Sequence, residues 1–139
     1  MPAHLILYPV LVQILLTMCM YVLLNVAKRK ALRRGEVDEA RRALDEGAWP
    51  DSVRKINNNI RNQFEVPVLF YVLALTLVVV NAVNFATLVL AWLFVASRVA
   101  HAYIHVGANY VPLRRRVFMA GCVIVIVLTL DVAWAAMAR

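Results

Sequence analysis

Acidic residues, cysteine and glycine are all scarce in this chain of 139 residues. It has eight Asp and Glu against fifteen Lys and Arg, two cysteines and four glycines. Neither a phosphate-binding P-loop nor a Rossmann glycine motif is present, and no Ser-His-Asp pattern or zinc-type spacing occurs. The chain therefore has none of the usual sequence signatures of nucleotide-binding proteins, serine hydrolases and zinc proteins.

The two cysteines, Cys19 and Cys122, both fall in long apolar stretches, where we expect buried thiols to act as small hydrophobic side chains. An even number of cysteines does not by itself imply a disulfide. The N-terminus also lacks the basic segment and the small-residue cleavage site of a signal peptide. The first apolar run is therefore interpreted as a retained span.

Apolar surface is what the chain has in excess, with 63% hydrophobic residues and a mean hydropathy of +0.73. Soluble proteins are about half apolar. One domain of 139 residues cannot bury so much apolar surface, so residues 1–139 are predicted to form a single integral membrane domain. The net charge of +7 does not require nucleic acid, because the basic residues flank the apolar runs and no RNA-binding signature is present.

The expected fold class is an all-α membrane protein, a four-transmembrane-helix up-down bundle. Spans long enough to cross a bilayer of about 20 helical residues are predicted at 5–26, 66–83, 85–106 and 117–138. Residues 27–51 form the first long loop. The second helix is expected to begin near Ser52, well before its span, and to bend just after Glu65 because Pro67 removes a backbone hydrogen bond.

The distribution of basic residues predicts how the chain is oriented across the membrane. Ten of the basic residues lie between the first and second spans and three lie between the third and fourth, whereas only Arg139 lies on the other side. Both basic loops are therefore predicted to be cytoplasmic, with both termini outside. Short loops and the lack of targeting signals favour a bacterial inner membrane, with an internal eukaryotic membrane as the alternative.

Two polar helix faces are predicted to meet on the cytoplasmic side. The second helix carries a set within about 80° of one another, namely Arg54, Asn58, Arg61, Asn62 and Glu65. The third helix and the loop after it carry Arg98, His101, His105, Asn109, Tyr110 and Arg114. The excess of cationic donors indicates an anionic ligand, and the alternative is a solvated helix face above a span.

Arg98 is predicted to lie about 12 Å inside its helix, where an arginine is costly unless it is paired. Glu65 is its expected partner. Arg61 and Arg114 are candidates to clamp a carboxylate, because a guanidinium can donate two parallel hydrogen bonds.

The histidines of the third span and the aspartate of the fourth give weaker evidence for a functional role. His101 and His105 have the i, i+4 spacing of metal ligands, but no third ligand has a suitable spacing, so no metal is expected. Asp131 in the fourth span needs a partner at that depth. We favour a hydrogen bond between helices over a proton or ion path.

Two stretches resemble a known family. Arg61-Asn62-Gln63-Phe64-Glu65-Val66-Pro67 resembles the Arg-Asn-x-x-Glu motif that opens helix 2 of the MAPEG family, the membrane-associated proteins of eicosanoid and glutathione metabolism. The stretch from Arg98 to His105, with Pro112-Leu113-Arg114, resembles helix 3 of that family and the loop after it. The resemblance covers the whole chain and implies a homotrimer of four-helix bundles, with glutathione bound between neighbouring subunits near the cytoplasmic side.

Carried over position by position, the resemblance implies that Arg114 stabilises the glutathione thiolate. The residues implied to contact, orient or support the tripeptide are Arg61, Asn62, Glu65, Arg98, His101, His105, Asn58, Arg29 and Lys30, with Lys28 as an alternative to the last two. Asn58 stands where the well-known eicosanoid enzymes have arginine, and His105 and Phe118 stand where they tend to have tyrosine. Prostaglandin or leukotriene synthesis is therefore not supported.

The leading hypothesis is a glutathione-transferase-like membrane enzyme that activates a thiol for attack on an apolar electrophile or hydroperoxide. A nearby cation favours the thiolate, which is the nucleophilic form. One alternative is a non-enzymatic membrane protein whose basic residues bind anionic lipid headgroups or small anions. Another, less favoured, is a small channel or carrier that uses Asp131 and Arg98.

Overall fold

The computed structural model describes residues Met1–Ala138, and Arg139 lies outside the described residues. The described chain is helical, with no strand between Met1 and Ala138. Its helices run in the order η1 (Ala3–Ile6), α1 (Leu7–Arg33), η2 (Glu46–Ala48), α2 (Asp51–Gln63), α3 (Val66–Val79), α4 (Phe85–Val106) and α5 (Val111–Met137). Four helical stretches of the described chain are long and apolar enough to cross a membrane, which confirms the predicted fold class: Ala3–Arg33, Asp51–Val79, Phe85–Val106 and Val111–Met137.

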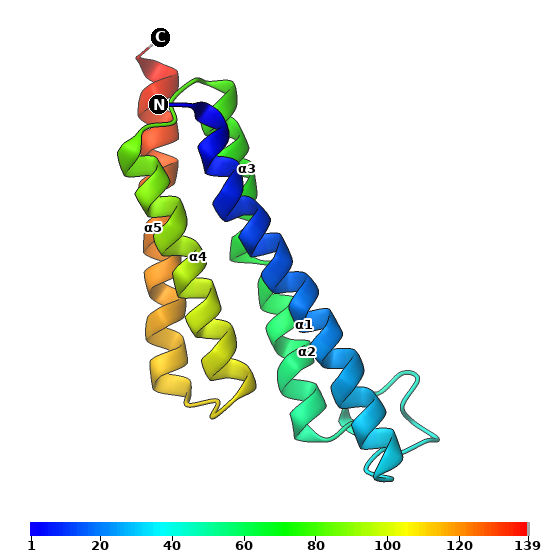
Figure 1. Ribbon diagram of the computed structural model, residues 1–139. Coiled ribbons are helices and arrows are strands. Elements are labelled where there is room, and N and C mark those ends of the chain that lie inside the picture. The colour runs from blue at the N-terminus through cyan, green and yellow to red at the C-terminus, as the bar shows by residue number, and fades with distance from the viewer. Residues whose placement is uncertain (139) are drawn as a thin grey trace.

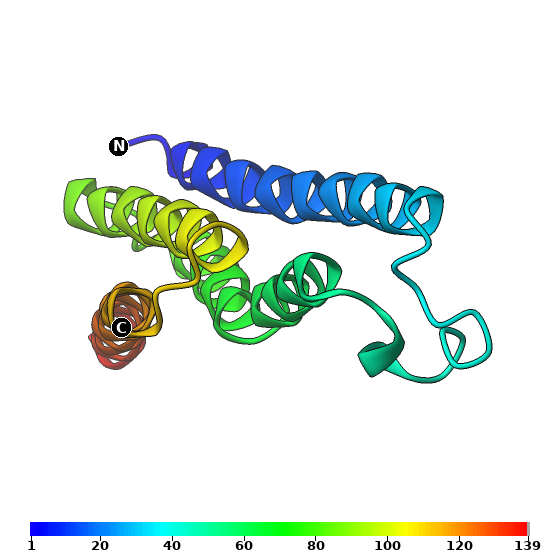
Figure 2. The same cartoon turned by 90° about the horizontal axis from the view of Figure 1, so that it is seen from below.

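The helices alternate in direction along one axis. Both termini and the turn between α3 and α4 lie at one end of the bundle, and the loops after α1 and α4 lie at the other (Figure 1). α1 packs along α2 and α4 packs along α5, while α1 and α2 also contact α4. The ends of α1 and α4 that carry the basic loops lie well apart, as the view from below also shows (Figure 2).

A complete break, not a bend, separates α2 from α3. Phe64 and Glu65 are non-helical, and the Phe64 amide donates to the carbonyl oxygen of Arg61 at 2.9 Å. In a continuous helix Pro67 would leave the Gln63 carbonyl without a donor, and its ring would clash with that carbonyl. α2 therefore ends at Gln63, and Pro67 lies in the first turn of α3, where a missing N–H is harmless.

Two other helices extend beyond the spans expected from hydropathy. α1 continues past residue 26 to Arg33, so Lys28, Arg29 and Lys30 are helical. α5 begins at Val111 rather than near 117, so Arg114 lies on the first turns of a helix and not in a loop.

Two apolar clusters stabilise the bundle at different heights. The cluster nearer the termini contains Ile6, Val10, Phe70, Ala74, Leu77, Ala91, Phe94, Val95, Val125 and Leu128. The cluster between α1 and α2 contains Leu24, Ala31, Val53, Ile56 and Ile60. The buried polar residues of α1, α2–α3 and α4 lie beside the residues of these two apolar clusters or between them in the sequence of each helix. A polar layer thus crosses the interior.

Gly121 allows α5 to approach α4 closely. It is buried, and a Cβ atom placed there would lie 3.0 Å from Ser97 Oγ and 3.7 Å from a ring carbon of Phe94. The Phe94 ring in turn stacks on Phe70, with ring centroids 4.4 Å apart. A side chain at position 121 would therefore press on Ser97 and pack directly against the Phe94 ring.

Gly121→Val is expected to destabilise the protein by about 1–3 kcal/mol, because an added side chain overpacks the α4–α5 contact. Ala120→Val is the matched control, since Ala120 is exposed on the same helix. Thermal unfolding in detergent would measure both variants. Equal unfolding temperatures for the two would contradict the close contact.

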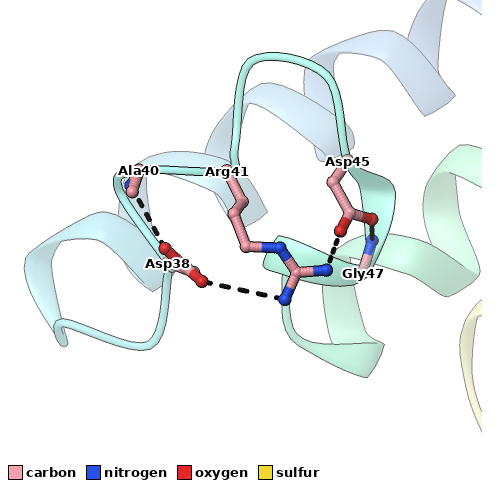
Figure 3. Close-up of polar contacts among 5 residues, drawn as sticks. All are labelled: Asp38, Ala40, Arg41, Asp45 and Gly47. Carbon is pink, nitrogen blue, oxygen red and sulfur yellow. Dashed lines mark hydrogen bonds and ion pairs between the residues drawn. The ribbon is translucent and has the colours of Figure 1, made fainter.

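The long loop after α1 is held by its own polar groups (Figure 3). The Arg41 guanidinium ion-pairs with Asp45 and lies 3.9 Å from Asp38, while the Gly47 amide donates to Asp45 Oδ1 at 2.7 Å. The Ala40 amide donates to Asp38 Oδ1 at 3.1 Å. The Gly47 hydrogen bond, followed by the Arg41 charge, holds the pKa of Asp45 below its usual value.

Acidification is expected to loosen this loop locally. Because the pKa of Asp45 is lowered from 3.8 in the folded chain, its carboxylate stabilises the loop fully above about pH 4. This contribution is lost as the pH falls through the lowered pKa. Hydrogen exchange at the Gly47 amide should report the loss, and Asp45→Asn should show it at neutral pH. Asp51→Asn is the control, since Asp51 pairs with Arg54 and with no other residue of Met1–Ala138. An identical Gly47 response in that variant would contradict the prediction.

Two smaller expectations are corrected. Cys19 is exposed on α1 and Cys122 is half-buried, and both are free thiols, so neither is a buried core residue. Asp131 is half-buried on α5, and its carboxylate forms no hydrogen bond or ion pair with another residue of Met1–Ala138. The expected hydrogen bond between helices is therefore absent from the single chain.

Candidate functional site

The candidate site is the polar layer inside the bundle. Its buried members are Gln13 and Thr17 on α1, Asn59 and Gln63 on α2, and Arg98, His101 and His105 on α4. Asn62 on α2 and Phe118 on α5 complete it as half-buried neighbours. We call this set the polar belt.

A directional chain of amide hydrogen bonds crosses the belt from α1 to α4. Gln13 Nε2 donates to Gln63 Oε1 at 2.8 Å, and Gln63 Nε2 donates to Asn59 Oδ1 at 3.2 Å. The Asn59 amide nitrogen then faces His105 Nδ1 at 3.5 Å, and the Asn62 amide nitrogen approaches the same atom at 3.4 Å. Because a side-chain amide nitrogen can only donate, His105 Nδ1 is the acceptor for both, and a neutral ring then carries its proton on Nε2.

Arg98 is the charged centre of the belt. Its side chain is 0% exposed, yet its only hydrogen bond in the described chain is from one Nη atom to the Asn62 carbonyl oxygen at 3.3 Å. Its guanidinium also lies over the Phe118 ring, 5.5 Å from the centroid. Nε and the other Nη atom have no partner, and neither has His101 Nδ1. A buried cation with two free donors favours an additional anionic or polar group.

The expected Arg98–Glu65 ion pair is absent from the single chain. Glu65 is exposed at the break between α2 and α3 and forms no ion pair with any described residue. It does lie within electrostatic range of Arg98. The break explains the difference, since Glu65 leaves the helical path that would have aimed it along the face of Asn62.

The predicted polar face of α2 is divided between two directions. Asn62 turns inward together with Asn59, whereas Asn58 and Arg61 are exposed. Arg61 forms an ion pair with Glu46 of the long loop, and Glu46 also accepts a hydrogen bond from Asn57 at 2.8 Å. Consecutive helical residues differ by about 100° in direction, so Arg61 and Asn62 cannot both face the belt.

Arg114 lies close to the belt but not inside it. It donates to the Asn109 side chain, and its charge acts on both His101 and His105. Arg29 and Lys30 are exposed on the last turns of α1 and have no hydrogen bond or ion pair with the belt residues described. The structure therefore brings together Asn62, Arg98, His101 and His105, with Arg114 and Glu65 nearby, and leaves Arg61, Asn58, Arg29 and Lys30 on the surface.

Asn59, Gln63 and Gln13 lie in the site but were not among the predicted site residues. The available signal was spacing, since Asn59 and Gln63 are four residues apart and bracket Asn62 on one side of α2. Within the described residues, no group of three or more His, Cys, Asp or Glu could hold a metal ion.

The family model described as MAPEG family matches residues 6–134 of the chain. The chain belongs to the MAPEG family. No curated protein and no solved structure matches it in the same comparisons. MAPEG membership makes the chain an integral membrane protein of a family that includes glutathione transferases and related membrane proteins.

Gln13 and Gln63 are expected to depend on each other. Gln13→Leu or Gln63→Leu alone leaves the other amide buried without its partner, which costs about 1–3 kcal/mol. The double variant should cost less than the sum of the two, because both polar groups are then replaced together. Unfolding free energies of the four proteins in the cycle would measure the coupling, and strict additivity would contradict the hydrogen bond.

Proposed function

We propose that this MAPEG protein is a glutathione-transferase-like enzyme of the membrane. It would bind glutathione, or a similar acid-bearing thiol, and activate it for attack on an apolar electrophile or hydroperoxide. The observation that carries the proposal is the buried guanidinium of Arg98, which has two donor atoms without partners beside the unpaired Nδ1 of His101. Such a group is stabilised by a bound carboxylate.

The charge distribution around the belt supports an anionic thiol. Arg98 and Arg114 are both close to the two histidines, and no acid of the described chain is paired with either arginine. A free thiol has a pKa of about 8.5, and a nearby cation lowers it toward the reactive thiolate. Arg114 is the proposed activating residue, since its bond to Asn109 is one that a ligand can replace.

Conjugation would proceed by direct displacement or addition. The thiolate sulfur forms a bond to the electrophilic carbon of the apolar partner. In a displacement, the bond from that carbon to the leaving group breaks, and its electron pair leaves with that group. In an addition, the π electron pair moves to the neighbouring atom, which is then protonated. The thiol proton passes to solvent before the attack. The exposed apolar surface of the spanning helices would give the electrophile access from the bilayer.

A homotrimer is part of the proposal. Arg61, Asn58, Arg29 and Lys30 point away from the belt of their own chain and are exposed. In a symmetric assembly, exposed residues of one subunit can complete the site of the next. Their position is compatible with glutathione held between subunits, on the side of the basic loops that we propose to be cytoplasmic.

Arg114→Ala is expected to weaken glutathione binding roughly tenfold to a hundredfold, the range for a lost charge-assisted hydrogen bond. It should also raise the pKa of the bound thiol toward its value in free glutathione. Isothermal calorimetry and the ultraviolet absorbance of the thiolate would measure the two effects. Arg115→Ala removes the same charge at the next, exposed position and is the matched control.

S-methylglutathione separates binding from activation, because it keeps both carboxylates and lacks the thiol. It should still bind and should give no thiolate signal. The proposal is wrong if glutathione shows no saturable binding to the native protein, or if Arg61→Ala and Arg114→Ala both leave binding unchanged.

The competing function is a membrane protein that only binds anionic lipid headgroups or small anions through its exposed basic residues. Lys30, Arg33 and Arg34 at the end of α1 are exposed and favour such contacts. Binding that weakens steeply with salt and does not discriminate thiols from other anions would favour it over the enzyme.

A further inference from the structure

An open apolar groove lies between α1 and α4, and none of its lining residues belongs to the proposed thiol site. Its volume is about 330 Å³. The α1 wall is formed by Leu16, Met20 and Leu23, and the α4 wall by Val99, Ala102 and Val106. Leu23 and Val99 are exposed in the single chain, so the groove faces outward.

This groove continues into a basic depression of about 400 Å³ at the end of the bundle that carries the long loop. Leu23 and Val106 line both spaces, so the two are contiguous. The depression holds the cations Lys30, Arg34 and Lys55 against the single acid Glu36. Glu36 lies 3.8 Å from Arg34, which leaves an excess of two positive charges.

One continuous stripe of α1 lines both spaces. Its members, spaced by three or four residues, are Leu16, Met20, Leu23, Ala27, Lys30 and Arg34. The apolar part from Leu16 to Ala27 is about 16 Å long, at 1.5 Å per residue. One leaflet of a bilayer's hydrocarbon core is about 15 Å thick. The stripe therefore changes from apolar to basic over the depth at which a lipid changes from acyl chain to phosphate.

We propose that this groove binds one phospholipid with an anionic headgroup. Its acyl chain would lie along α1 and α4, and its phosphate would lie between Arg34 and Lys55. Charge complementarity decides against a second copy of this chain as the occupant. The depression has an excess of two positive charges and the chain itself has a net charge of +7, so an anionic lipid complements this surface better than a second copy does. The inference does not depend on thiol chemistry.

The test compares phosphatidylglycerol with phosphatidylcholine of identical acyl chains, added to the detergent-purified full chain and read by native mass spectrometry. The native protein should retain phosphatidylglycerol preferentially. The double variant Arg34→Gln and Lys55→Gln should lower this retention by roughly tenfold to thirtyfold, at about fivefold per cation. The double variant Arg115→Gln and Arg116→Gln removes the same charge from a separate surface depression and should retain it. Lys30 is left intact, because the proposed thiol site also includes it.

Leu23→Trp tests the apolar half, because the indole would fill the point where the two spaces meet. It should reduce retention of both lipids, whereas Leu23→Ala, which leaves the groove open, should not. Equal loss of phosphatidylglycerol in the two double charge variants would overturn the proposal.

A photoreactive acyl chain on phosphatidylglycerol gives a readout that needs no variant. Its cross-links to the native protein should map to α1 and α4 within the groove. Cross-links confined to other helices, or a subunit-to-subunit cross-link through Val99, would also overturn the proposal.

Discussion

The constraint that shapes this protein is a guanidinium buried among membrane-spanning helices. Hydrocarbon offers no hydrogen bonds, so Arg98 must obtain them from the chain or from a ligand. The chain supplies one, from the carbonyl of Asn62, together with the face of the Phe118 ring. Two nitrogen atoms of the guanidinium are left without a partner, and the proposed binding site rests on that deficit.

The other residues of the polar belt are explained by the same constraint. A buried amide is most stable when its donors and acceptors are matched, and hydrogen bonds link Gln13, Gln63 and Asn59 in turn, with only Gln13 Oε1 of this chain of bonds left without a partner among the described residues. The chain of bonds ends on His105, next to Arg98. These hydrogen bonds therefore set the spacing of α1, α2 and α4 at the level of the Arg98 charge, while apolar packing sets the helix spacing at other levels of the bundle.

The break before Pro67 changes which polar groups near the belt are free to make contacts. Because α2 stops at Gln63, the Asn62 carbonyl is free to accept from Arg98 in place of a helical amide. Glu65 is released toward the surface at the same point. On the other side of α4, the apolar groove runs into exposed lysine and arginine. The proposed thiol site and the proposed lipid site thus share α4 as a common wall and use different faces of it.

The sequence predicted best those structural features that depend on local residues alone. Hydropathy and length located all four spanning helices, because a bilayer requires about 20 apolar residues of each. Helix ends were less certain, since Lys28 to Arg33 and Val111 to Arg116 are polar enough to be loops and are helical only because the helix continues beyond its apolar part. Because Pro67 cannot donate to the carbonyl of Gln63, four residues earlier, the end of the helix could have been predicted at Gln63. The prediction of a bend instead of a break misplaced Glu65.

The sequence by itself determined the family and the helical membrane class, since these follow from composition, spacing and the Arg61 to Pro67 motif. Only the tertiary structure decided which polar residues share the interior. Arg61 and Asn62 are adjacent in the chain, and the position of α4 turns one of them outward to Glu46 and the other inward to Arg98 and His105. The physical reason is that a helix has one inward direction at each height, and that direction is set by the neighbours it packs against.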